Sequence, residues 1–208
     1  MSQSEPLDRY VSKVVESSRI DDKILTMQLI RGLEKTRDET LKYFSFDPRD
    51  LEHTYAPGKW SVRFILHHLA DSETVLFERI RRTLSEPRPV LWVFDQDAWA
   101  KGLDYSQVPL EISRQLFESA RNAVIYYAGA YYESKGHLEF VHSVTGVRTL
   151  KDEFDKVASH NEHHLGQIRL ALQGHLWAQA TDAILQLSAE SQSCREERRW
   201  TRDDLHER

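Results

Sequence analysis

Apolar residues recur every three or four positions along most of the chain, the spacing that places them on one face of an α-helix. Only eight glycines and six prolines interrupt this pattern. No strand-like alternation is long enough to compete with it. The pattern therefore predicts a nearly all-α protein, with a little extended structure only around Leu138 to Val141.

Capping residues and prolines divide the pattern into four long helices. Ser61 and Thr149 are suited to begin helices, because their hydroxyl groups accept hydrogen bonds from free backbone N–H groups. Proline cannot continue a helix, because it has no N–H group and its ring clashes with the preceding turn. The predicted helices run from about Ile24 to Phe44, from Val62 to about Ser85, from Pro109 to about Ser134, and from Leu150 through Gln173 with Gly174 at its end.

The segments outside these helices are predicted to be additions to one bundle domain. Residues 94–99 and 135–148 are turn-rich connections, and a short helix is predicted near the N-terminus. Residues Trp177 to Leu187 have the spacing of a further amphipathic helix, and residues 192–208 are so rich in charge that a frayed or mobile tail is expected. The predicted division is an N-terminal extension (1–19), a four-helix bundle domain (20–175) and a C-terminal helix with a charged tail (176–208).

The composition excludes several classes of protein. With 28 basic and 33 acidic side chains the net charge is −5, which argues against a nucleic-acid-binding protein that relies on a general positive field. No apolar run approaches the roughly 20 residues that cross a bilayer, and the first residues lack a signal pattern, so a cytoplasmic protein is expected. Cys194 is the single cysteine, which excludes an intrachain disulfide bond.

Five of the ten histidines lie in two clusters, at residues 67–68 and 160–164. His160 and His164 are four residues apart and lie on one edge of the apolar face of the fourth helix, as a chelating pair requires. A helical wheel puts His68 roughly 110° and His67 roughly 150° from the centre of the apolar face of the second helix. We therefore predict that His68 points inward together with His160 and His164, and that His67 and His163 point outward.

The same spacing has alternatives. A chain with ten histidines produces a four-residue spacing by chance fairly often, so a helical interaction module with incidental histidines stays open, as does a binding protein without turnover. The zinc-protease pattern is excluded, because it requires a glutamate directly after the first histidine and Asn161 stands there.

Three separated segments, taken together, resemble the DinB/YfiT-like metalloenzyme family. They are residues 58–63 continuing into 68–73, residues 94–99, and residues 160–168, and their order and spacing match over roughly residues 20–175. The resemblance implies a four-helix bundle with a long crossover connection. It also implies a divalent metal bound by His68, His160 and His164, which agrees with the helical wheels.

The resemblance also indicates the kind of chemistry. Family members are often labelled metal-dependent hydrolases, and related proteins transfer low-molecular-weight bacterial thiols. Three neutral imidazoles leave an open coordination position on the metal, for which zinc or nickel is expected, and this position suits a bound water or thiolate. We therefore expect an S-transferase-like or hydrolase-like enzyme that acts on a small molecule, with homodimerisation through residues 177–187 and no nucleic-acid or membrane partner.

Other side chains near these motifs are candidates either for a role at the metal site or for a structural role. Asp71, Glu73 and Gln167 lie within a turn or two of the histidines and are candidates to orient them, although Glu73 has an equal claim to pair with an arginine. Asp95 and Asp97 fit turn formation or helix capping better than catalysis. Trp60 and Trp99 are interpreted as packing residues, with lining of a pocket as the alternative, and His142 as a loop residue outside the metal site.

Overall fold

The computed structural model describes the backbone of residues 7–197, and the side chains of residue 20, residues 22–174 and residue 186. Its elements are, in chain order, α1 (Leu7–Tyr43), the 3-10 helix η1 (Asp50–Glu52), α2 (Val62–Ser85), β1 (Val90–Leu91), α3 (Gln96–Gly102), α4 (Leu110–Tyr131), β2 (Glu139–His142), β3 (Gly146–Thr149) and α5 (Leu150–Glu197). The predicted all-α class and the four-helix bundle are confirmed.

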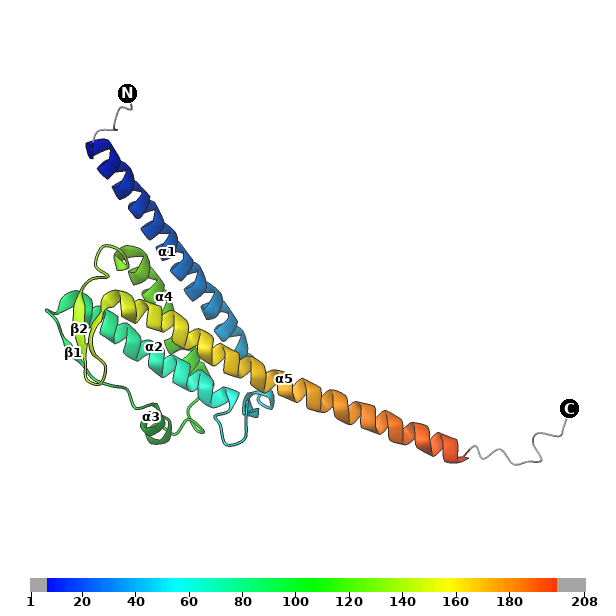
Figure 1. Ribbon diagram of the computed structural model, residues 1–208. Helices are drawn as coiled ribbons and strands as arrows, with labels where there is room; N and C mark the ends of the chain where they lie inside the picture. The colour runs from blue at the N-terminus through cyan, green and yellow to red at the C-terminus, as the bar shows by residue number, and fades with distance from the viewer. Residues whose placement is uncertain (1–6, 198–208) are drawn as a thin grey trace, which may run out of the picture.

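The four long helices α1, α2, α4 and α5 form the bundle (Figure 1). Each of α1 and α2 packs against both α4 and α5, so the order around the bundle is α1, α4, α2, α5. Helices α1 and α2 therefore occupy opposite corners although they are consecutive in the chain. The long connection from α2 to α4 carries β1 and α3 back along the side of the bundle, from the end of α2 to its first two turns, where Phe94 packs on His68 and Tyr105 on His67.

The predicted helix starts are made by the expected caps. The Ser61 hydroxyl accepts a hydrogen bond from the Phe64 N–H, and the Thr149 hydroxyl accepts one from the Asp152 N–H. The Asp152 carboxylate in turn accepts the Thr149 N–H at 2.9 Å, which completes a reciprocal pair of caps. These caps fix where α2 and α5 begin, and therefore where their histidines lie.

Two predictions about the connections between the helices were wrong. Residues 96–102 form the helix α3 rather than a loop, with the Asp95 carboxylate accepting the Ala98 N–H as its cap. Residues 90–91 and 146–149 join the predicted extended segment in a three-stranded sheet of order β1-β2-β3, parallel between β1 and β2 and antiparallel between β2 and β3. A two-residue strand is too short to show an alternating pattern.

Helix α5 does not end at Gly174 but continues to Glu197, so the predicted helix at residues 177–187 is part of it, and α1 is likewise one helix from Leu7. A single interior glycine lowers helix stability by only about 1 kcal/mol, which helix-forming neighbours can offset. The homodimer prediction concerns side chains of residues 177–187, and the structure describes only that of Gln186 among them. The side chain of Cys194 and the tail 198–208 also lie outside what the structure describes.

The bundle core consists of two apolar clusters separated by a polar layer. One cluster surrounds Phe117 and Leu165, and the other surrounds Val124 and Phe154. Between them each of the four helices contributes polar side chains that are buried: Thr36 and Thr40, Glu73, Arg121, and Asn161. No helix among the described residues is long and apolar enough to span a membrane.

The Arg121 guanidinium is the centre of this polar layer. It is fully buried and binds both carboxylate oxygens of Glu73, at 2.7 and 2.8 Å. It also donates to the Leu33 carbonyl and to the Thr36 hydroxyl, and more weakly to the Asn161 amide oxygen at 3.4 Å. Because these groups come from all four helices, the network fixes the position of α5 along the bundle axis relative to α2.

Candidate metal centre

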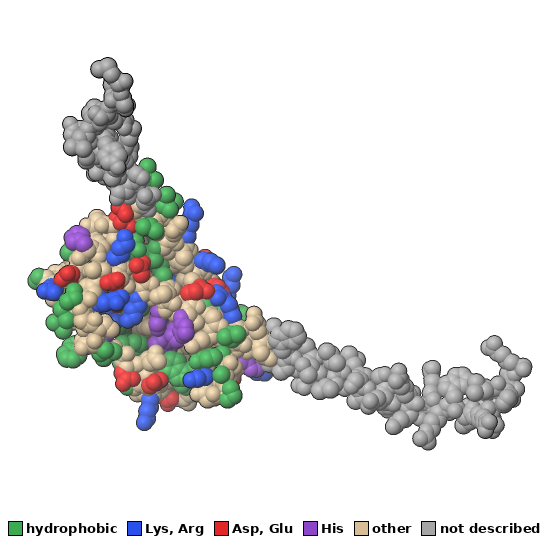
Figure 2. Space-filling model, viewed as in Figure 1, with side chains coloured by type: hydrophobic (Ala, Val, Ile, Leu, Met, Phe, Trp, Pro, Cys, Tyr) green, Lys and Arg blue, Asp and Glu red, His purple; other side chains and the backbone are tan. Residues whose placement is uncertain are grey.

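Helices α2 and α5 bring three histidines to one point on the side of the bundle. His68 lies in the second turn of α2, and His160 and His164 lie one turn apart on α5. One ring nitrogen from each histidine can be chosen so that all three nitrogens lie within 4.8 Å of one another. Figure 2 shows histidine side chains forming a patch that is open to solvent on this face. The three residues that sequence spacing selected are therefore neighbours in space.

The nitrogen geometry fits a metal ion. His68 Nε2 and His160 Nε2 are 3.2 Å apart. Two nitrogen ligands bound at 2.0–2.1 Å to a tetrahedral zinc ion are themselves about 3.3 Å apart. Among the described residues, this cluster contains no carboxylate or thiol, so the candidate ligands are imidazoles alone.

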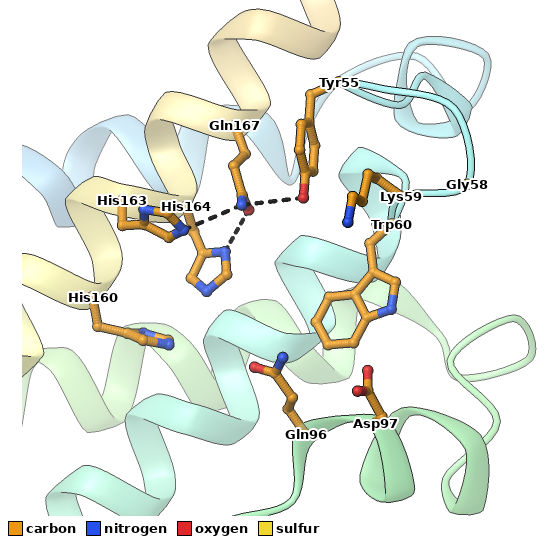
Figure 3. A pocket seen from close by; sticks show the side chains of 10 residues that line it. All are labelled: Tyr55, Gly58, Lys59, Trp60, Gln96, Asp97, His160, His163, His164 and Gln167. Carbon is orange, nitrogen blue, oxygen red and sulfur yellow. Dashed lines mark hydrogen bonds between the residues drawn. The ribbon is translucent and has the colours of Figure 1, made fainter.

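Gln167 fixes the tautomer of His164. The amide oxygen of Gln167 lies 2.8 Å from His164 Nδ1 (Figure 3). Because that oxygen can only accept a hydrogen bond, the hydrogen of a neutral His164 is on Nδ1 and the lone pair is on Nε2. The Gln167 amide nitrogen donates to the Tyr55 hydroxyl at 3.3 Å, which anchors the orienting group to the loop before α2.

Aromatic residues hold the His68 ring in place. The edge of Trp60 packs against it with ring centroids 5.2 Å apart, and Phe94 stacks on its face at 5.8 Å with nearly parallel planes. His68 Nδ1 is buried and has no hydrogen-bond partner among the residues that the structure describes. The ring is thus oriented by packing, while the ring of His164 is oriented by a hydrogen bond.

The environment keeps the three imidazoles neutral. Burial, with the neighbouring His164 as the second cause, lowers the pKa of His68 to about 3 and that of His160 to about 2. Burial also lowers the pKa of His164, and its hydrogen bond to Gln167 opposes that shift. Neutral imidazole is the protonation state that binds metals, so the site is in its ligating state at neutral pH.

These shifts predict how the stability of the metal-free protein depends on pH. An unfolded histidine titrates near pH 6.5, so below that pH the unfolded chain takes up protons that folded His68 and His160 do not. The contribution of these neutral histidines to the free energy of unfolding is therefore fully present above pH 6.5. Below that pH the free energy of unfolding is expected to fall by about 1.4 kcal/mol per pH unit for each such histidine. Urea unfolding of the metal-free protein between pH 7.5 and 5.5 measures this slope.

A matched pair of variants isolates the contribution of the buried group. His160→Leu is expected to show a shallower pH slope than His137→Leu, because His137 is exposed on the connection before β2. Equal slopes in the two variants would contradict this explanation.

A cleft of about 500 Å³ opens onto His160 and His164. Figure 3 shows its walls: α5 on one side, and the loop before α2 and the start of α3 on the other. The cleft carries one ammonium group, on Lys59, and one carboxylate, on Asp97, in addition to neutral polar side chains. Its lining residues are Tyr55, Gly58, Lys59, Trp60, Gln96, Asp97, His160, His163, His164 and Gln167.

A second, smaller cavity of about 230 Å³ lies on the other side of the histidines. It follows the groove between α2 and α5 towards the sheet and is lined in part by His68 and His160. His160 and Gln96 border both cavities. The three-histidine cluster therefore stands where two cavities meet.

Comparison with known proteins places this site in a family. The family model described as the DinB superfamily matches residues 32–168, about two thirds of the chain, and this range includes all three histidines. The chain belongs to the DinB superfamily. The resemblance predicted from the sequence is confirmed by this match.

Three individual proteins are similar to this chain over most of its length. A protein of Oceanobacillus iheyensis named "Putative metal-dependent hydrolase" is 29% identical over 160 residues, which cover 77% of this chain and 91% of that protein. A protein of Halalkalibacterium halodurans with the same description is 29% identical over 62% of this chain and 74% of its own length. The solved structure of YfiT from Bacillus subtilis, described as a probable metal-dependent hydrolase with an unusual four-helix bundle topology, matches with a TM-score of 0.64 at 24% identity. That match covers 72% of this chain and 87% of YfiT.

The outward prediction for His67 was wrong. His67 is 1% exposed, packs against the tilted ring of Tyr105, and its Nδ1 lies 2.7 Å from the Ser113 hydroxyl of α4. The wheel assumed one buried face, but α2 packs against α4, α5 and α3 at once. His163 is exposed, as predicted, although it also lines the rim of the larger cleft.

The other candidate residues separate into two groups. Gln167 contacts His164, and Asp97 lines the larger cleft. Asp71 and Glu73 have partners elsewhere: the Tyr105 hydroxyl donates to Asp71, whose pKa is raised by burial, and Glu73 pairs with Arg121. Asp95 caps α3, and Trp99 packs on Phe94.

Several residues that surround the site were not predicted from the sequence. Tyr55, Lys59 and Gln96 lie on loops or at a helix start, where no periodicity marks a side chain that faces a cavity. Trp60, interpreted as a packing residue, also lines the larger cleft, and His142, set aside as a loop residue, lines the smaller cavity. The GKW sequence before Ser61, part of the family resemblance, was the available signal for the first of these loops.

Proposed function

We propose that this protein is an enzyme that uses a divalent metal bound by His68, His160 and His164 to act on a small molecule. The observation that carries the proposal is the meeting of three neutral imidazoles at 3.2–4.8 Å with a solvent-open cleft on them. The names of the DinB-superfamily relatives, which refer to metal-dependent hydrolases, support a divalent metal and a small-molecule substrate. Zinc and nickel are the metals we propose, because imidazole nitrogen suits both.

A divalent ion held by three neutral ligands keeps its full charge and lowers the pKa of a water or thiol that it coordinates. The protein side chains supply the remaining functions. Gln167 keeps the His164 lone pair directed at the centre, and Trp60 and Phe94 exclude water from the His68 ring. Lys59 and Asp97, on the walls of the cleft, are placed to bind a polar substrate and to accept a proton at its mouth.

Within this proposal we favour thiol transfer over hydrolysis. Two cavities meet at His160 and Gln96, which suits a reaction between two organic molecules, whereas hydrolysis needs space for one organic molecule and a water. In the proposed transfer a carbon–sulfur bond forms and the bond from that carbon to its leaving group breaks. The leaving group departs with the electron pair, and the thiol proton passes to solvent.

Activity of the metal-loaded protein tests the proposal. Zinc- and nickel-loaded protein is assayed with a small thiol and 1-chloro-2,4-dinitrobenzene, and separately with 4-nitrophenyl acetate. Metal-dependent thioether formation that is lost in His160→Leu and kept in His137→Leu is the expected result. Ester cleavage without thioether formation would support a hydrolase and contradict the proposed thiol transfer. Metal binding without turnover of either kind, and with no exchangeable water, would indicate a non-catalytic binding protein.

Gln167→Leu is expected to weaken zinc binding by about 10–100-fold, the usual effect of removing a group that orients a metal ligand. The reason is that His164 loses the acceptor that fixes its tautomer. Competition with a chromogenic chelator at pH 7.5 measures the affinity. The control is Gln173→Leu, which changes an exposed glutamine on the same helix. Equal zinc affinity in the two variants would rule out an orienting role for Gln167.

A further inference from the structure

The smaller cavity runs from the histidine cluster to the sheet, along the groove between α2 and α5. Its floor is formed by α2 residues from His68 to Arg79, and Lys156 and His160 of α5 form one side. The segment after β1, with Val93, Phe94 and Gln96, covers it, and His142 of β2 closes the far end. The cavity thus extends away from the metal ligands in one direction and has a polar end.

Two cationic side chains reach this polar end. Arg79 is 3% exposed. Its guanidinium donates a hydrogen bond to the Trp92 carbonyl and a longer one, of 3.4 Å, to the Glu153 carboxylate. The ammonium group of Lys156, at the exposed rim, makes no hydrogen bond or ion pair with any residue that the structure describes. Burial, and in part the charge of Arg79, lowers the pKa of Lys156, while Glu153 opposes that shift.

His142 adds a neutral donor. Its Nδ1 accepts hydrogen bonds from the N–H groups of Val144 and Thr145, at 3.3 and 3.2 Å. Because an accepting Nδ1 carries no hydrogen, the hydrogen of neutral His142 is on Nε2. Burial, followed by the charge of Arg79, lowers the pKa of His142 and so favours this neutral form.

The balance of charge at this end is positive. Arg79 and Lys156 supply two cationic groups, and Glu153 beside Arg79, whose pKa is raised by burial, supplies at most one negative charge. No aspartate or glutamate is among the described residues that line the cavity. A small cavity with two cations, an N–H donor and no lining carboxylate is suited to an anionic group, because charge-assisted hydrogen bonds to carboxylates are stronger than neutral ones.

We propose that this cavity is a subsite for the carboxylate of the substrate, with Lys156 and His142 as the groups that bind it and Arg79 as the buried charge behind them. The inference rests on the proposed function in taking the three histidines as the reacting centre. Lys156 lies one helical turn before His160, roughly 6 Å along the axis of α5. The substrate class is therefore a short acid whose reactive group and carboxylate are separated by about four atoms.

Two matched probes test the subsite. They are 4-sulfanylbutanoate and 4-sulfanylbutan-1-ol, which share chain length and thiol and differ only in the terminal carboxylate. Isothermal titration gives their Kd values for zinc-loaded and metal-free wild-type protein, for Lys156→Met and for Lys151→Met. Lys151 is the control because it lies on the same helix, pairs with Glu133 and does not line the cavity.

The acid is expected to bind wild-type and Lys151→Met protein about 10-fold more tightly than the alcohol, the usual size of a charged hydrogen bond. In Lys156→Met the two probes are expected to bind about equally. Equal binding of both probes to the wild-type protein, or an unchanged preference in Lys156→Met, would overturn the subsite. If removal of the metal leaves the affinities for both probes unchanged, the thiol does not bind at the histidines. A preference of the metal-free protein for the acid would still support the subsite.

Discussion

Replacing Arg121 by methionine is expected to lower the free energy of unfolding by about 3–5 kcal/mol, the usual result of breaking a buried ion pair by removing one partner. Arg121 is fully buried and forms two hydrogen bonds with Glu73, which is 2% exposed. Methionine fills much of the space but leaves the Glu73 carboxylate buried without its cation. Urea unfolding at pH 7.5, followed by circular dichroism, measures the change.

Arg169→Met provides the matched control. Arg169 also forms two hydrogen bonds with a carboxylate, that of Glu39, but both groups are partly exposed. Its loss is expected to change stability by less than about 1 kcal/mol, because solvent screens exposed pairs. A change in Arg121→Met no larger than that in Arg169→Met would show that the polar layer does not hold the bundle together.

The second large effect concerns metal binding. Replacing His160 by leucine is expected to weaken zinc binding by more than about 100-fold, because the loss of a ligand exceeds the loss of a group that only orients one. His160 is the residue that connects the other two: its Nε2 faces His68, and His164 lies one turn away. Chelator competition at pH 7.5 measures the affinity, with His137→Leu as the control. Unchanged affinity in His160→Leu would remove this residue from the ligand set.

The parts of the fold that depend on local chemistry were predictable from the sequence. Ser61 and Thr149 mark helix starts because a cap is made within three residues. The triad could be proposed because His160 and His164 share a face on any helix and a helical wheel favoured His68 as the inward histidine of the second helix; the family resemblance implied the same three residues. These features depend on one helix at a time or on a motif.

The parts that depend on partners distant in sequence could not be predicted. Glu73 lies on an apolar face, and the sequence left open whether it orients a histidine or pairs with an arginine. Only the three-dimensional contact with Arg121, 48 residues later in the chain, shows that it pairs with an arginine. His67 was misplaced because its partner Ser113 lies on another helix. An apolar pattern marks buried hydrophobic residues, and it cannot mark polar residues that are buried with a partner.

The site shows the same division. The candidate ligands came from helices, whereas part of the cavity walls comes from loops, a helix start and a short strand, where Tyr55, Gln96 and His142 are brought to the site only by the tertiary fold. Local rules also could not decide whether the fourth helix ends at Gly174 or continues beyond it. A single glycine is common at helix ends but does not require one.

X-ray absorption at the zinc edge of the zinc-loaded protein tests the central claim most directly. The account predicts three imidazole nitrogens at about 2.0–2.1 Å and a further oxygen from exchangeable solvent. It also predicts that one imidazole disappears from the spectrum in His160→Leu and none in His137→Leu. Four ligands from the protein, or fewer than three imidazoles around the wild-type metal, would contradict it.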